Sequence, residues 1–131
     1  MRLVACPVAL HPDGGIRRIA ICQHPTQGLQ LLSAPSDTEQ AATATAARHL
    51  YAVSGLETRA ALPIGTSPDI QPDAHWHFAL CRIVPPVRDR WQHLCAHSSQ
   101  LLQFSWISLD AAVDGLDAKD ARALDWIKTT L

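Results

Sequence analysis

The sequence has no long apolar run, no extended run of like charge and no closely spaced cysteine pair. No stretch approaches the ~20 apolar residues needed to span a membrane. The 11 basic and 12 acidic residues give a formal net charge of −1, and no like-charge run is longer than Arg17-Arg18. An electrostatic footprint for nucleic acid or an acidic membrane is therefore absent. We predict neither kind of partner.

The cysteines are few and scattered, without a C-x-x-C spacing. Each lies among aliphatic residues, where a free thiol behaves as a small hydrophobe; the four are Cys6, Cys22, Cys81 and Cys95. The apolar start at residues 1–10 is interrupted by Pro7 and followed by a turn, so it is interpreted as a first strand rather than a signal peptide. These features predict a cytoplasmic protein. Its length suits a single domain over residues 1–131.

The pattern of apolar residues predicts strands on both sides of one central helix. Apolar, β-rich runs at 2–10 and 16–22 flank an Asp-Gly-Gly turn, which is typical of a hairpin. Further strands are expected at 29–32, 58–64, 75–84 and 101–107, with a loop at 65–72.

Alanine-rich composition and end signals predict the helices. Ser36 and Glu39 form a capping-box pattern, and the helix is expected to run from there to about Val53, ended by Gly55. Helical pieces are also expected at 111–114 and 118–128. Asp117 is the expected N-cap of the second piece, whose apolar stripe is Ala121, Leu124 and Ile127. This order predicts an α+β or layered α/β fold.

A partly matched motif runs from Ala34 to Leu56. Its pattern is G-x5-E-x7-R-E-U-x-E-E-x-G-U, with U aliphatic, and the chain matches it at Arg48, at Leu50 and at the final Gly55-Leu56. The pattern has glutamates where this chain has His49, Ala52 and Val53; Ala34 and Gln40 replace its first glycine and first glutamate. The segment resembles the box of the Nudix superfamily.

The replaced positions fall within one helical turn and would converge on one point. Three carboxylates about 4 Å apart repel by roughly 4 kcal/mol per pair at an effective dielectric near 20, so they need a cation between them. Mg²⁺ prefers oxygen ligands, and an imidazole, a methyl and an isopropyl group offer it almost none. We therefore assign no catalytic residue and no metal ligand.

The Nudix resemblance implies a mixed sheet sandwiched between helices, and Trp106-Ile107-Ser108-Leu109-Asp110 is similar to a segment that precedes the last helix in many members. With the glutamates absent, we expect no Mg²⁺-dependent pyrophosphohydrolase activity and no cofactor. The expected function is a binding or interaction module for a small, nucleotide-like ligand. The alternative is a divergent hydrolase of nucleoside diphosphate-linked compounds, with Mg²⁺ held by Glu39, Asp37 or loop aspartates. A homodimer through an apolar box face is a further possibility.

Arg48, His49 and Glu39 are the candidate ligand-binding residues, His49 through contact with a phosphate when protonated. Strand alternation places two other groups of potential zinc ligands on shared faces, namely His75, His77 and Cys81, and then His93, Cys95 and His97. Polar strand faces and buried thiols are the preferred interpretation of both. The tryptophans are expected in the core, and the alternative for Trp76 or Trp91 is a place in the lining of a cleft.

Overall fold

The computed structural model describes residues 1–131, which form one mixed sheet and two helices. The strands are β1 (Arg2–Leu10), β2 (Arg18–His24), β3 (Gly28–Gln30), β4 (Ala34–Ser36), β5 (Thr58–Ser67), β6 (Ala74–Ile83), β7 (Arg90–Leu94) and β8 (Leu101–Ser108). The helices are α1 (Ala42–Ser54) and α2 (Ala118–Thr130).

The main path of the sheet runs β5-β6-β1-β2-β8-β7, while β3 pairs with β2 and β4 with β1. The longest ladder is parallel and joins β1 to β6 from Arg2↔Ala74 to Leu10↔Arg82. The hairpin predicted after residue 10 is present, but β1 and β2 pair only at its base, at Leu10↔Ile19. Beyond that point β2 diverges from β1 and pairs with β8.

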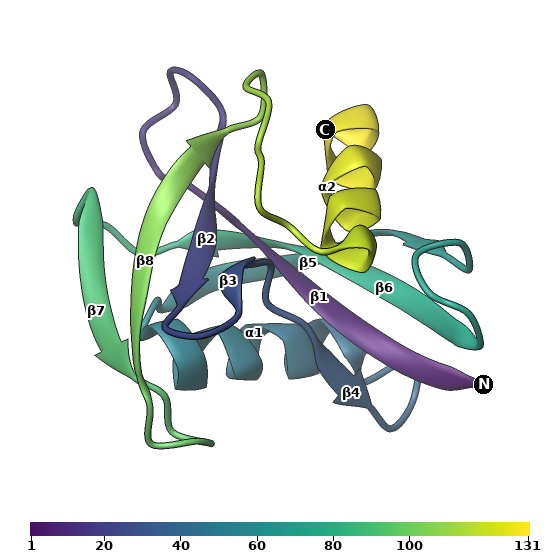
Figure 1. Ribbon diagram of the computed structural model, residues 1–131. Coiled ribbons are helices and arrows are strands. Elements are labelled where there is room, and N and C mark those ends of the chain that lie inside the picture. Colours follow the sequence, from purple (N-terminus) through teal and green to yellow (C-terminus); the bar gives the residue numbers. More distant parts are fainter.

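The helices cover opposite faces of the sheet, with α1 below and α2 above in Figure 1. Because successive strand residues point to opposite faces, β1 contributes to two cores. Val4, Cys6 and Val8 belong to the cluster that includes residues of α2, together with Trp76 and Phe78. Alternate residues of β1 face α1, so this one strand organises both layers.

The α1 side of the sheet is packed with small residues. Ala5 and Ala79 of the sheet meet Ala42 and Ala46 of the helix in one buried cluster. Methyl side chains let a helix approach a sheet closely, and alanine is also the best helix former. The alanine-rich sequence therefore both forms α1 and sets its distance from the sheet.

The predicted layered α+β architecture, a mixed sheet between helices, is confirmed. Strands lie at or near all of the predicted ranges. Gly55 ends α1 in the left-handed region with φ 77°, and its N–H donates to the Tyr51 carbonyl. Asp117 caps α2 as predicted, accepting from the Asp120 N–H.

Several predicted boundaries are wrong. Residues 34–36 form β4, in which Ser36 pairs with Leu3, so Ser36 cannot cap a helix and α1 begins six residues later at Ala42. The Thr38 hydroxyl instead accepts from the Ala41 N–H. Residues 111–114 are not helical. Strand β5 continues to Ser67, past a bulge between Pro63 and Gly65, into the predicted loop.

The expectation that the cysteines are buried is confirmed, since all four are buried and free. Burial raises the pKa of Cys22 and of Cys81 to about 11, and burial also raises the pKa of Cys6. Such thiols stay protonated near neutral pH and are poor nucleophiles. Neither helix is long and apolar enough to cross a membrane.

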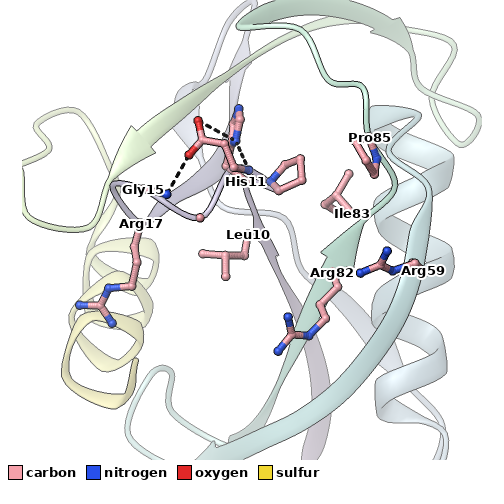
Figure 2. Close-up of a pocket in the computed structure, with 11 residues that line it drawn as sticks. Leu10, His11, Gly15, Arg17, Arg59, Arg82, Ile83 and Pro85 are labelled. Carbon is pink, nitrogen blue, oxygen red and sulfur yellow. Dashed lines mark hydrogen bonds and ion pairs between the residues drawn. The ribbon is translucent and has the colours of Figure 1, made fainter.

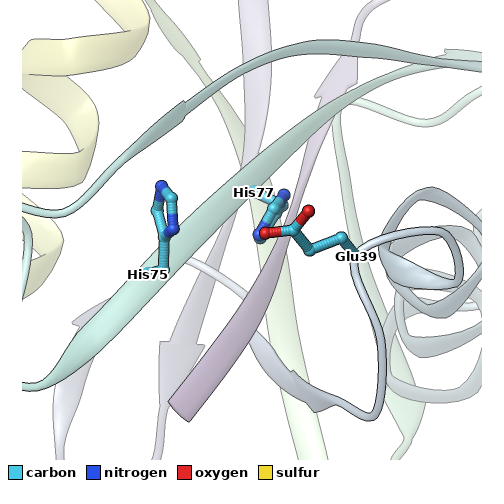
Figure 3. Close-up of side chains that lie close together, drawn as sticks. All are labelled: Glu39, His75 and His77. Atoms are coloured by element: carbon cyan, nitrogen blue, oxygen red, sulfur yellow. The ribbon is translucent and has the colours of Figure 1, made fainter. Parts of the chain in front are cut away.

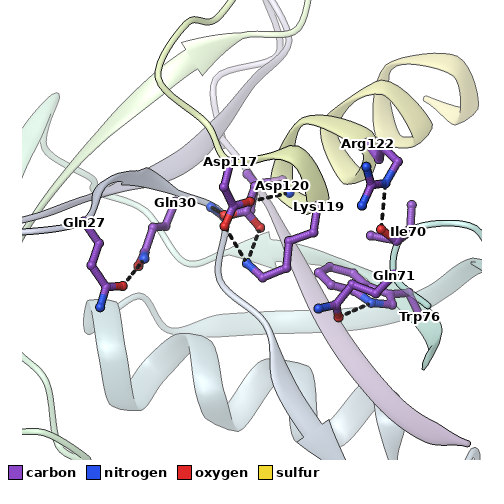
Figure 4. A network of polar contacts seen from close by, with 10 residues as sticks. Gln27, Gln30, Ile70, Gln71, Trp76, Asp117, Lys119, Asp120 and Arg122 are labelled. Atoms are coloured by element: carbon purple, nitrogen blue, oxygen red, sulfur yellow. Dashed lines mark hydrogen bonds and ion pairs between the residues drawn. The ribbon is translucent and has the colours of Figure 1, made fainter. Parts of the chain in front are cut away.

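The first turn of α2 carries a buried carboxylate (Figure 4). Asp120 is 0% exposed; its Oδ1 accepts from Lys119 Nζ at 3.2 Å and its Oδ2 from the Leu31 N–H at 3.4 Å. Burial raises the pKa of Asp120, against the opposing effect of the Lys119 ammonium. The buried apolar stripe of α2 differs from the predicted one at a single position. Leu124 and Ile127 are buried as predicted, but Ala123 is buried in place of Ala121.

Asp120 makes stability depend on pH in a predictable direction. A carboxyl whose pKa is higher in the folded state binds protons more tightly there, so its contribution rises as pH falls through the folded pKa toward the unfolded value near 3.9. We predict that the free energy of unfolding of the wild type, relative to Asp120→Asn, increases as pH falls from 7 toward 4. Urea unfolding of both proteins at several pH values measures this difference. A difference that grows with rising pH contradicts the account.

Candidate functional site

Of the three residues on one face of α1 that replace the glutamates of the box, Val53 is enclosed by apolar packing, whereas His49 and Ala52 are half-buried. Val53 is 5% exposed and packs in a cluster with Cys22, Cys95, Leu102 and Phe104. The backbone of Ala52 is also engaged, since its carbonyl accepts from the Ala96 N–H at 3.0 Å. The expectation that this face offers an available apolar patch is therefore wrong at Val53.

Arg48 and His49, the two other box residues proposed as ligand contacts, have local partners. Arg48 is exposed and its guanidinium donates to the Thr45 hydroxyl at 3.4 Å. The ring of His49 stacks on that of His97, with centroids 5.7 Å apart. Burial lowers the pKa of His49, and the nearby His97 lowers it further. His49 is therefore mainly neutral near pH 7, which weakens the expected contact of a protonated ring with phosphate.

Glu39, the third proposed contact, is not near Arg48. It lies in the loop before α1, whereas Arg48 lies six residues into the helix, about 9 Å along its axis from Ala42. Glu39 instead comes close to His75 and His77 of β6 (Figure 3). One ligand atom from each of these three residues lies within 4.8 Å of the others.

The two groups of histidines and cysteines that could have bound zinc do not come together as complete sets, and both thiols are buried, as the preferred interpretation expects. The Cys81 thiol is buried and directed to the Ala79 carbonyl at 3.7 Å, rather than joining His75 and His77. Cys95 and His97 follow the end of β7 and do not share a strand with His93. The His93 ring instead pairs with the Val53 carbonyl at 3.1 Å.

A pocket of about 290 Å³ lies at the carboxyl end of β1 and is rich in arginine. Arg17, Arg59 and Arg82 line it, and none of the three forms an ion pair. Figure 2 shows Arg17 on one side and Arg59 and Arg82 on the other, with Leu10 between them. Unpaired guanidinium groups around one pocket favour an anionic occupant.

The acidic residue of this pocket is already neutralised. Asp13 accepts from Arg18 at 2.7 Å and from the Gly15 N–H at 3.2 Å. The Gly15 hydrogen bond contributes most to a lowered pKa of Asp13, and Arg18 adds to it. Asp13 thus orders the turn after β1 and leaves the charge of the three pocket arginines uncompensated.

Sequence reasoning missed this pocket. A register shift leaves Arg59 as an extra, unpaired residue between Thr58, which pairs with Ile83, and Ala60, which pairs with Arg82. A bulge of this kind re-aims a side chain, and nothing in the sequence marks it. The tryptophan alternatives are resolved in part: Trp76 is 0% exposed and belongs to the core, whereas Trp91 lines a second pocket and stacks on Phe104 with centroids 5.4 Å apart.

Comparison with known proteins supports the fold and goes no further. No family model matches the sequence, and no curated protein matches it. Among solved structures, the chain is similar to an ADP-ribose pyrophosphatase from Streptococcus suis 89-1591, with a TM-score of 0.70 and 18% identity over 98% of this chain and 90% of that chain. The chain therefore shares its overall fold with that pyrophosphatase.

We predict that restoring a carboxylate at position 53 disrupts the protein. The Val53→Glu variant places an ionisable group in an apolar cluster, which costs roughly 3 kcal/mol or more of the free energy of unfolding. The control is Tyr51→Glu, on the same helix at a side chain that is 59% exposed, with an expected change within about 0.5 kcal/mol. Urea unfolding measures both. Equal stability of the two variants would contradict the prediction, because it would show that position 53 is accessible to water.

Proposed function

We propose that this protein binds a small, phosphate-bearing, nucleotide-like ligand and does not hydrolyse it through Mg²⁺ held by α1. It is a Nudix-fold binding or interaction module whose box retains the helix and loses the metal chemistry. The main support is the environment of Val53. A helix position packed against Cys95 and Leu102 can neither hold a cation nor expose one to a substrate.

Loss of the metal ligands extends across the helix face. His49 offers an imidazole with a lowered pKa, and Ala52 offers no donor atom in its side chain. Mg²⁺ requires several oxygen ligands in octahedral geometry and dehydrates reluctantly. A diphosphate approaching this face would therefore meet no cation to offset its charge.

The pocket lined by Arg17, Arg59 and Arg82 supports binding without catalysis. Its volume of about 290 Å³ is near the lower end of the range for small-molecule sites. Guanidinium groups make bidentate, charge-assisted hydrogen bonds with phosphate oxygens. None of the residues that line this pocket comes from α1, so binding here needs no box residue.

The first test measures Mg²⁺-dependent turnover, which we expect to be absent. We expect no release of AMP from ADP-ribose, and no cleavage of other nucleoside diphosphate derivatives, when Mg²⁺ is added at millimolar concentration. Chromatography of the reaction products measures the outcome. Mg²⁺-dependent cleavage that disappears in His49→Ala would contradict the proposal, because it would place the chemistry on α1.

Ligand binding is tested with ADP as the probe. We predict that Arg82→Ala weakens ADP binding by about tenfold or more, since a hydrogen bond to a charged group contributes about 1.5–3 kcal/mol. Isothermal titration calorimetry of the wild type and variant measures the change.

Arg48→Ala is the matched control for this titration, because it removes an exposed arginine of the box and is expected to bind ADP like the wild type. If Arg48→Ala abolishes ADP binding and Arg82→Ala binds like the wild type, the ligand binds at the box residues and not in the arginine-lined pocket. Failure of the wild type to bind ADP or a related diphosphate would contradict the proposal that the ligand is nucleotide-like.

One observation favours the alternative of a divergent hydrolase. Glu39, one of the residues considered as a substitute metal ligand, lies beside two histidines, although Asp37 does not join that group. In such an enzyme a metal-activated water would attack phosphorus while the cation offsets charge on the oxygens. Cleavage of ADP-ribose that requires Glu39 and survives His49→Ala would favour this function over a binding module.

A further inference from the structure

Two histidines of β6 and the glutamate of the loop before α1 form the densest group of possible metal ligands in the molecule. Ligand atoms of Glu39, His75 and His77 lie within 4.8 Å of one another, with the two rings half-buried and the glutamate exposed. The imidazole rings are tilted, with centroids 5.1 Å apart. In Figure 3 the Glu39 carboxylate lies beside the ring of His77.

His77 carries an unusual feature that points to a missing partner. Its Nε2 atom is buried and has no hydrogen-bond partner, one of only two buried side-chain polar atoms in this condition. Buried polar groups in folded proteins are almost always satisfied. The ring also lines a small cavity of about 100 Å³ with Glu39 and Thr43, so an occupant has room beside it.

We propose that Glu39, His75 and His77 bind one divalent transition-metal ion, with Zn²⁺ as the best match. Two imidazoles and one carboxylate are the protein ligands of an open zinc site, in which water takes the fourth position. The exposed side of Glu39 provides access for that water. This site is independent of the arginine-lined pocket and of the proposed function.

The distances are compatible with coordination after a small adjustment. Zn–N and Zn–O bonds of about 2.0–2.2 Å in tetrahedral geometry separate the ligand atoms by about 3.3 Å. The ligand atoms lie at most 4.8 Å apart. Binding of the ion therefore requires each pair to approach by at most about 1.5 Å. Glu39 lies on a loop and has three rotatable side-chain bonds, so its carboxylate is free to move toward the two rings.

The scaffold under the histidines is rigid. Strand β6 is hydrogen-bonded on both sides, with His77 opposite Ala5 of β1 and Thr66 of β5. His75 and His77 are two residues apart and point to the same face. A pair of ligands fixed by a central strand, with a third from an adjacent loop, gives a preorganised site.

The donor set also selects the class of ion. Imidazole nitrogen suits zinc, copper, iron and nickel, whereas Mg²⁺ and Ca²⁺ prefer oxygen ligands. A site with two nitrogen donors and one carboxylate therefore favours Zn²⁺ over Mg²⁺. This is a different ion, held by different residues, from the one that the Nudix box implies.

The test is titration of metal-stripped protein with Zn²⁺ by calorimetry at pH 7. We expect one ion per chain in the wild type, and binding weakened by about tenfold or more in Glu39→Gln and in His75→Ala. Glu39 is exposed, so Glu39→Gln is expected to fold, and circular dichroism verifies this. Co²⁺ substitution provides a second readout, because its visible absorption reports low coordination number and should disappear in both variants.

His97→Ala is the matched control, because it removes a ring from the molecule's other close pair of histidines, His49 and His97. We expect this variant to bind Zn²⁺ like the wild type. The proposal is overturned if the wild type binds no Zn²⁺, if Glu39→Gln and His75→Ala bind like the wild type, or if His97→Ala alone abolishes binding.

Discussion

The alternation of side chains along β1 determines how both helices pack on the sheet. Val4, Cys6 and Val8 enter the core on the α2 side, while Ala5 joins the alanine cluster beneath α1. Because β1 pairs with β6 over its full length, it also sets the register of the histidines. The end of the same strand leads into the turn that Asp13 orders, next to the pocket arginines. Both proposed sites therefore depend on the placement of one strand.

The proposed loss of metal chemistry in α1 leaves the features that form this helix in place. The features that form the helix are alanine composition and the left-handed Gly55 at its end, and neither requires a metal. The glutamates of the pattern would add repulsion that only a cation relieves. At one of these positions this chain has Val53, which packs against Cys95 and Leu102. The similarity to a pyrophosphatase at 18% identity is thus a similarity of architecture.

Local signals in the sequence predict most of the elements but not the sites. The apolar run of β1, the end of α1 at Gly55 and the cap at Asp117 are all encoded within a few residues, and each was predicted. The start of α1 was missed because Ser36 pairs with Leu3, a contact across 33 positions. Glu39 and His77 meet only through the packing of α1 against β6, and Arg59 depends on a bulge. No pattern in the chain specifies such long-range contacts.

A Mg²⁺ titration followed by backbone amide NMR tests whether α1 binds the cation. The account predicts that the amide shifts of residues 49–53 stay unchanged at millimolar Mg²⁺, because this face of α1 carries no carboxylate and Val53 is buried. Saturable shifts centred on these residues would show that the helix still binds the cation, and would contradict the claim that the box has lost its metal.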